Sequence, residues 1–180
     1  MVTTHRRENF GAPLGEICAA VLELTEAFGD LHVALPVHPN PALRMQVEER
    51  LAGHPRVTLL PPLGYRDMVE LLGRACIVMT DSGGLQEEAP SLGVTVRVLR
   101  DVTERWEGVE AGTARLVGTD RARIVDEATA LLGSPSEYAM MARAVNPYGD
   151  CLASQRVVDA LRGRRVVEWD PALAAAARAA

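Results

Sequence analysis

Two polar segments of the sequence carry residue types suited to binding an anion. They are THRRENFG at 4–11 and DSGGLQEE at 81–88. A turn of Ser82, Gly83 and Gly84 that opens a helix lets the backbone approach a ligand closely and leaves N–H groups free to face a phosphate. The same three residues also suit an N-capping serine followed by glycines that permit tight packing, so the turn alone does not decide between the two interpretations.

Charged residues flank this turn. Glu87 and Glu88 fall in the first turn of the expected helix, where acids are favoured by the helix dipole. An acid would repel a phosphate there, so at least one is expected to turn to sugar hydroxyls. Arg105, in a polar loop after another expected strand, could clamp a diphosphate oxygen with its planar guanidinium. A surface ion pair with Glu104 or Glu107 is the alternative.

The histidines and cysteines do not predict a metal or redox site. His5 and His38 both follow expected strands, but the sequence has no HxxxH or HExxH spacing, so a metal site is not expected. Cys18, Cys76 and Cys151 are an odd number at wide spacing without a CxxC pair, which favours reduced structural thiols. All basic residues are arginine, which excludes a Schiff-base or P-loop lysine.

Length and composition indicate one ordinary globular domain. The chain has 180 residues, of which 48% are hydrophobic and 24% charged, and this excludes a disordered chain and a small disulfide scaffold. The net charge is −5 with no basic block, so neither a nucleic acid nor an anionic membrane is expected as a partner. The N-terminus is polar from its third residue and no apolar run approaches about 18 residues. A cytoplasmic protein is expected.

Short β-like runs alternate with helical patterns from end to end, which is typical of parallel α/β layers. Strands are expected at 1–4, 31–37, 57–60, 75–80, 94–99 and 114–117, and helices near 14–28, 41–52, 65–74, 83–92, 120–133, 136–145 and 152–163. This order predicts a doubly wound, Rossmann-like parallel sheet of six strands, arranged 3-2-1-4-5-6. Ligands bind such sheets beyond the carboxyl ends of strands one and four. The two polar segments are therefore expected to meet.

The chain is expected to form one domain at 1–163 and an alanine-rich C-terminal extension at 164–180. The first strand, at 1–4, is shorter than the usual five to six residues or so, and such a strand usually follows a linker from a preceding domain. We therefore expect this strand to be truncated and the chain to be the C-terminal half of a longer protein.

The polar segments also carry a family resemblance. The matching motifs are THRRENFG at 4–11, HPNP at 38–41, TDSGGLQEEAPSLG at 80–93, LRDVTERWEGVEAGTARLVGTD at 99–120 and NPYGD at 146–150. Together they resemble the C-terminal half of the non-hydrolysing UDP-N-acetylglucosamine 2-epimerases, two-domain enzymes with a GT-B-like architecture. The resemblance covers residues 1–163. It implies interconversion of UDP-GlcNAc and UDP-ManNAc by elimination and re-addition of UDP, without a cofactor.

The resemblance also implies roles for individual residues. Carried over by position, the UDP contacts are His5 at the diphosphate, Ser82, Gly83 and Gly84 at a phosphate, Glu88 at the ribose hydroxyls and Arg105 at the departing diphosphate. His5 and Arg105 would be the catalytic residues of this half. In some bacterial members Arg6 and His38 would also contact a second, allosteric UDP-GlcNAc.

Some positions depart from the family pattern. Val94-Thr95 replaces the usual Lys-Pro, Trp106 a proline, Cys151 a glycine, and Met68 an aromatic residue near the uracil. The proline would have stiffened the backbone that positions Arg105.

The resemblance places the family's acid/base carboxylates in the N-terminal domain, and no residue of 1–180 matches them by motif. The chain is therefore expected to be inactive alone, with UDP or UDP-GlcNAc and an N-terminal epimerase domain as partners; the full-length protein is expected to be a homodimer. Two alternatives stay open. One is a stand-alone nucleotide-sugar-binding or regulatory module. The other is a fragment of a GT-B glycosyltransferase, which is not expected to combine THRRENFG with NPYGD.

Overall fold

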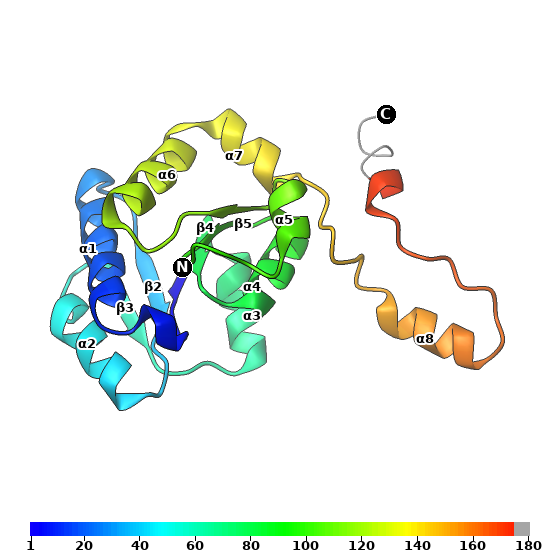
Figure 1. Ribbon diagram of the computed structural model, residues 1–180, viewed down its shortest axis with the longest axis horizontal. Helices are drawn as coiled ribbons and strands as arrows, with labels where there is room; N and C mark the ends of the chain where they lie inside the picture. Colours follow the sequence, from blue (N-terminus) through cyan, green and yellow to red (C-terminus); the bar gives the residue numbers. More distant parts are fainter. Residues whose placement is uncertain (175–180) are drawn as a thin grey trace.

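The structure is a computed structural model, and it describes residues 1–174 (Figure 1). Strands and helices alternate along most of this length, as the sequence predicts. The strands are β1 (Val2–Thr3), β2 (Val33–Pro36), β3 (Val57–Leu60), β4 (Ile77–Thr80), β5 (Thr95–Val98) and β6 (Ala114–Leu116). The α-helices are α1 (Ala12–Ala27), α2 (Pro41–Leu51), α3 (Tyr65–Gly73), α4 (Gly83–Glu88), α5 (Trp106–Glu110), α6 (Arg121–Gly133), α7 (Pro135–Ala142) and α8 (Ala153–Leu161). Two 3₁₀ turns are η1 (Arg7–Asn9) and η2 (Ala89–Leu92).

The six strands form two parallel sheets, so the prediction of one six-stranded sheet was wrong. One sheet has the order β1-β4-β5-β6, and β2 pairs with β3 in the other. Strand β1 contacts β2, so the neighbours follow the predicted order, but no ladder joins these two strands. Successive residues of a strand turn their N–H and C=O groups to opposite edges. The two residues of β1 pair with Met79 and Thr80 of β4, which leaves too few groups for a second ladder.

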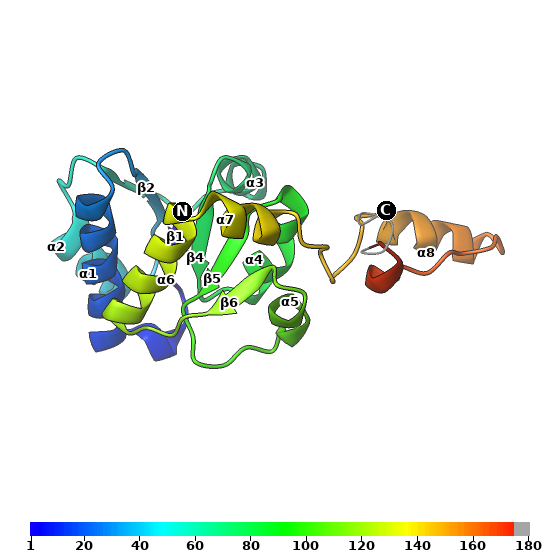
Figure 2. The ribbon, with the colours of Figure 1, turned by 90° about the horizontal axis from the view of Figure 1, so that it is seen from above.

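Helices cover both faces of the strand layer (Figure 2). On one face, apolar residues of α1, α2 and α6 form a core with β1, β2 and part of β4; on the other, residues of α3 and α4 pack on β4, β5 and β6. Strand β4 shows why both faces are covered, since Ile77 and Met79 belong to the first core and Val78 to the second. Alternate residues of a strand point to opposite faces, so a strand buried on both is mostly apolar.

Local sequence signals explain how the elements begin and end. Asn40 caps α2 by accepting a hydrogen bond from the N–H of Ala42, and Pro41 occupies the first helical position, as predicted. The helix expected at 83–92 is α4 followed by the 3₁₀ turn η2. Pro90 has no N–H to donate to the carbonyl four residues earlier, so a regular α-helix cannot continue through it. The turn η1 and the short helix α5 were not predicted.

The C-terminal part of the described chain, which includes helix α8, lies away from the strand layer in both views (Figures 1 and 2). Helix α8 has no buried residue. The division into 1–163 and 164–180 remains a prediction, and its last residues, 175–180, lie outside the described part of the chain. Among residues 1–174, none of the helices has the length and apolar character needed to cross a membrane.

Candidate functional site

A cleft of about 380 Å³ opens at the carboxyl ends of β1 and β4, where the sequence predicts a ligand site. It is lined by Thr3, Thr4, His5, Pro36, Val37, His38, Pro39, Pro62, Leu63, Tyr65, Met68, Ser82, Gly84, Leu85 and Glu88. Five of the predicted site residues are therefore found together: His5, His38, Ser82, Gly84 and Glu88. The lining combines polar groups with proline and apolar side chains, a combination that suits a nucleotide.

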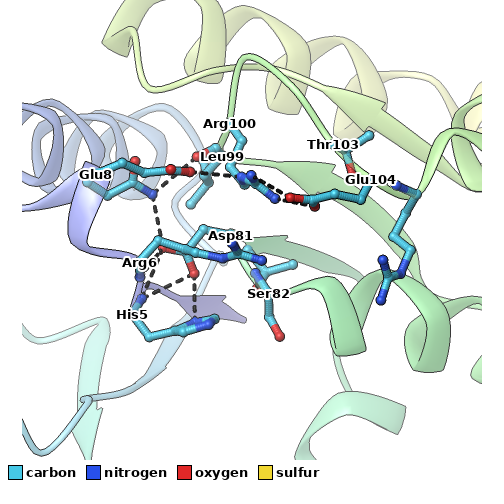
Figure 3. Close-up of polar contacts among 12 residues, drawn as sticks. His5, Arg6, Glu8, Asp81, Ser82, Leu99, Arg100, Thr103 and Glu104 are labelled. Atoms are coloured by element: carbon cyan, nitrogen blue, oxygen red, sulfur yellow. Dashed lines mark hydrogen bonds and ion pairs between the residues drawn. The ribbon is translucent and has the colours of Figure 1, made fainter.

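Asp81 joins the two polar segments (Figure 3). Its carboxylate is fully buried and accepts hydrogen bonds from the backbone N–H groups of His5 and Arg6, at 2.9 to 3.1 Å. It also accepts from the side-chain amide of Asn9 at 2.9 Å and contacts Nδ1 of His5 at 2.8 Å. Asn9 in turn donates to the carbonyl of Leu99, which ties the same turn to the end of β5. One carboxylate thus holds the segment after β1 against the end of β4.

This environment fixes both the charge of Asp81 and the orientation of His5. Burial alone would raise the pKa of Asp81, but the hydrogen bonds from the His5 side chain and from the backbone of Arg6 and His5 outweigh burial and lower it. Asp81 is therefore ionised at neutral pH. A carboxylate accepts hydrogen bonds, so Nδ1 of His5 carries the proton in this contact. Nε2 of the ring is then left for another partner.

The turn into α4 combines both interpretations of Ser82-Gly83-Gly84. The Ser82 hydroxyl caps the helix by accepting from the N–H of Leu85 at 3.5 Å, and the Ser82 N–H donates to the hydroxyl of Thr80 at 3.0 Å. The first N–H groups of a helix, here at Gly83 and Gly84, have no carbonyl partner within the helix. Ser82 and Gly84 line the cleft. The serine is a cap, and the glycine backbone beside it can still meet an anion.

Arg105 lies beside this turn but does not line the cleft. Its guanidinium is 3.7 to 4.0 Å from the place that a Cβ on Gly83 would occupy, and its Nε donates to Glu87. The alternative prediction of an ion pair between Arg105 and Glu104 or Glu107 was therefore wrong, because the partner is Glu87. Glu87 is the acid that turns away from the cleft, and Glu88 is the one that lines it.

Glu104 is held instead by Arg100, which is 5% exposed at its side chain (Figure 3). Arg100 donates to both oxygens of Glu104, at 2.8 and 3.2 Å, and to Glu8 at 2.9 Å. The hydrogen bond from Arg100 is the main cause that lowers the pKa of Glu104 to about 2. This network connects η1 to the loop that carries Arg105.

The two residues expected at a second nucleotide differ in their relation to the cleft. His38 lines the cleft, and its ring stacks on that of His5 with centroids 6.4 Å apart and planes at 25°. Nδ1 of His38 accepts from the N–H of Asn40 at 3.2 Å. Arg6 does not line the cleft and contributes its backbone N–H to Asp81. Within residues 1–174, no group of three or more His, Cys, Asp or Glu side chains is arranged to hold a metal.

Sequence reasoning assigned no role to Asp81, Asn9, Gln86 or Thr103, although all four are buried at the site. The Thr103 hydroxyl donates to the side-chain oxygen of Gln86 at 2.7 Å and accepts from the N–H of Arg105 at 3.1 Å. A usable signal for Asp81 was its position directly after a strand whose residues are all apolar or Thr, because a carboxylate there must find donors. Nothing local marks Thr103 or Gln86, whose contact joins two different elements.

The family model described as UDP-N-acetylglucosamine 2-epimerase matches residues 1–162. The chain belongs to this family. The UDP-N-acetylglucosamine 2-epimerase of Escherichia coli K12 is 50% identical over 167 residues, which are 92% of this chain and 44% of that relative. The chain thus spans less than half the length of this epimerase.

Solved structures of related proteins have the same fold. A Staphylococcus aureus MnaA–UDP co-structure matches with a TM-score of 0.88 and 39% identity over 93% of this chain and 48% of that one. A Neisseria meningitidis UDP-GlcNAc 2-epimerase bound to UDP-GlcNAc matches with a TM-score of 0.85 and 41% identity, covering 91% and 44%. These two relatives were therefore solved with a nucleotide or nucleotide sugar of the kind that the motifs of this chain suggest.

Proposed function

We propose that this chain is the C-terminal, UDP-binding half of an epimerase that interconverts UDP-GlcNAc and UDP-ManNAc. The observation that carries the proposal is the meeting of His5, Ser82, Gly84 and Glu88 in one cleft at the carboxyl ends of β1 and β4. The relative solved with UDP and the UDP-GlcNAc 2-epimerase solved with UDP-GlcNAc support the choice of ligand. The cleft has the polar and apolar parts that a diphosphate and a base would each need.

The proposed residues contact different parts of the nucleotide. The N–H groups at Gly83 and Gly84 and the Ser82 hydroxyl receive a phosphate, and Glu88 accepts hydrogen bonds from the ribose hydroxyls. The base lies toward the apolar wall that includes Tyr65 and Met68. A carboxylate suits the ribose because it can accept two hydroxyl donors, whereas close to the phosphates it would be repelled.

Catalysis by this half would concern the leaving group. Breaking the bond between C1 of the sugar and the diphosphate oxygen places negative charge on UDP. The guanidinium of Arg105 stabilises that charge, and so does the imidazole of His5 when Nδ1 donates to Asp81 and Nε2 also carries a proton, as donors aimed at developing charge do in other enzymes. Arg105 must exchange its Glu87 partner for the diphosphate, a movement of one half-exposed side chain.

Removal of the C2 proton needs a base within hydrogen-bond reach of that proton. In the proposal this base comes from an N-terminal domain that closes on the cleft. Because half of a cleft supplies phosphate contacts without closure, the 180-residue chain should bind UDP weakly.

Calorimetry with UDP tests the nucleotide site. Binding of UDP and much weaker binding of ADP are expected, since the base wall should select uracil. Glu88→Gln should raise the Kd for UDP about tenfold through the ribose contact, a loss typical of a charge-assisted hydrogen bond. Glu26→Gln, an exposed residue of α1, is the matched control and should leave the Kd unchanged. No heat at millimolar UDP, or equal Kd values in the two variants, would refute the site.

Proton exchange at C2 of UDP-GlcNAc in deuterated water, followed by NMR, tests the reaction. The chain alone should catalyse no exchange, and exchange should begin when a matching N-terminal epimerase domain is supplied in cis or in trans. Exchange by the chain alone would refute the division of labour between the halves. UDP binding without exchange in the reconstituted protein would instead favour a stand-alone binding module.

A further inference from the structure

The NPYGD segment, at residues 146–150, contacts the loop of Arg105. The Tyr148 hydroxyl donates a hydrogen bond to the carbonyl oxygen of Arg105 at 3.0 Å and accepts one from the N–H of Gly108 at 2.9 Å. Asn146 anchors the segment, because its side-chain amide donates to the carbonyl of Glu87 at 3.2 Å and to the hydroxyl of Ser91 at 2.6 Å. One tyrosine oxygen therefore bridges the residue before α5 and a residue within it.

The contact depends on a glycine. A Cβ on Gly108 would lie 2.7 Å from the Tyr148 hydroxyl, so a side chain at this position would displace the ring. Burial is the main cause that raises the pKa of Tyr148, and the phenol therefore remains protonated and able to donate at neutral pH. The hydroxyl is thus used as a donor and as an acceptor by two backbone groups three residues apart.

Two contacts together fix the backbone of Arg105. Thr103 accepts from its N–H and Tyr148 donates to its carbonyl, so both polar groups of the peptide backbone at this residue are held. The side chain is then directed over Gly83. No proline stiffens the loop at the next position, which is Trp106.

We propose that Tyr148 is a positioning residue that orients Arg105 toward the bound diphosphate. The inference rests on the proposed function, since it assumes that UDP binds at the cleft and that Arg105 contacts it. It assigns to the NPYGD segment a role at the nucleotide site, although the segment does not line the cleft. The hydroxyl acts through the backbone of Arg105 and does not touch the ligand.

The test measures UDP binding to the 180-residue chain and to Tyr148→Phe, which removes the hydroxyl and keeps the ring. The Kd for UDP should rise about threefold to tenfold, because the substitution removes both hydrogen bonds of the hydroxyl and with them a restraint on the backbone of Arg105. Tyr138→Phe is the matched control, because Tyr138 packs partly buried against the core away from the cleft, and its Kd should be unchanged. Uridine, which has no phosphate, should bind equally to all three proteins.

A double-mutant cycle with Arg105→Ala separates positioning from general loosening of the fold. If Tyr148 acts through Arg105, Tyr148→Phe has no further effect on the Kd in the Arg105→Ala background. The inference is overturned if Tyr148→Phe weakens UDP binding equally in both backgrounds, or if it has no effect in the otherwise unsubstituted chain. In either case, UDP binding by the unsubstituted chain would still uphold the nucleotide site. Absence of UDP binding by the unsubstituted chain overturns the proposed function and the inference together.

Hydrogen exchange at one amide gives an independent reading of the contact. The Gly108 N–H should exchange faster in Tyr148→Phe than in the unsubstituted chain, because it loses the nearer of its two acceptors and keeps only the Arg105 carbonyl at 3.2 Å. Unchanged exchange at Gly108 would show that the hydroxyl does not hold the loop, and would overturn the inference without reference to any nucleotide.

Discussion

Replacing Asp81 by asparagine should destabilise the chain more than any other conservative change at the site. Every group that contacts this carboxylate is a donor: the backbone N–H groups of His5 and Arg6, the side-chain amide of Asn9, and Nδ1 of His5. Asparagine is nearly the same shape but replaces one acceptor oxygen by an NH₂ group. In a fully buried position, the substitution therefore places the NH₂ group against other hydrogen-bond donors.

The size of the loss follows from which donors are left without an acceptor. If the NH₂ replaces Oδ2, it faces the N–H of Arg6 and the amide of Asn9, both at 2.9 Å. If it replaces Oδ1, it faces Nδ1 of His5 at 2.8 Å. Each unsatisfied buried donor costs about 1–3 kcal/mol, and loss of the charge weakens the bonds that remain. We expect a decrease in the free energy of unfolding of about 3 kcal/mol.

The same contacts set the pH dependence of this loss. The pKa of Asp81 is lower in the folded chain than its unfolded value of about 3.9. A group with a lowered folded pKa contributes stability that is fully present above the unfolded pKa and is lost as the pH falls through the folded pKa. The difference in stability between the two proteins should therefore narrow below about pH 4, as Asp81 takes up a proton.

Urea unfolding followed by circular dichroism, at several pH values, measures the loss in free energy of unfolding and its pH dependence. Asp30→Asn is the control, because Asp30 is exposed in the loop between α1 and β2, and it should match the unsubstituted chain within about 0.5 kcal/mol. Equal stability of Asp81→Asn and the unsubstituted chain at pH 7 would refute the assignment of Asp81 as a buried acceptor. A stability difference that widens as the pH falls would refute its ionisation.

Three further predictions concern other parts of the chain. Trp106→Pro should raise the free energy of unfolding by about 0.4–1 kcal/mol, because proline suits the first position of α5; a loss in urea unfolding would show that the indole contacts matter more. Burial raises the pKa of the Cys18 thiol to about 11, so iodoacetamide at pH 8 should modify the exposed Cys76 and Cys151 well before Cys18, and equal rates by mass spectrometry would contradict this. Deletion of 166–180 should change stability by no more than about 0.5 kcal/mol, and a large fall in Tm would show that the segment packs on the domain.

The sequence predicted every strand and most helices because their signals are local. Apolar residues in β4 and at helical spacing in α1, and the Asn40-Pro41 cap of α2, each depend on neighbouring residues only. Sheet pairing depends on contacts between distant segments, and the break between β1 and β2 could not be read from either run alone. Helix α5 has five residues, too few to show a period.

The same distinction applies to the site. Residues that follow the two strands were placed together correctly, since the carboxyl ends of parallel strands meet at one edge. The partner of Arg105 was not predictable, because Glu87 lies 18 residues away on another element. Tyr148 and Gly108 are 40 residues apart in the sequence, so residue spacing could not predict their contact either.

The charges at the site explain how an acidic chain can receive a diphosphate. The net charge is −5, and several acids stand beside the turn into α4. Most of these acids already have cationic or hydrogen-bond-donating partners: Asp81 has His5, Glu87 has Arg105, and Glu8 and Glu104 share Arg100. Among the described residues that line the cleft, Glu88 is the single acid. Since paired carboxylates project little field into the cleft, the N–H groups of the turn can attract an anion locally despite the overall charge, and the sign of the net charge carries little information about the ligand.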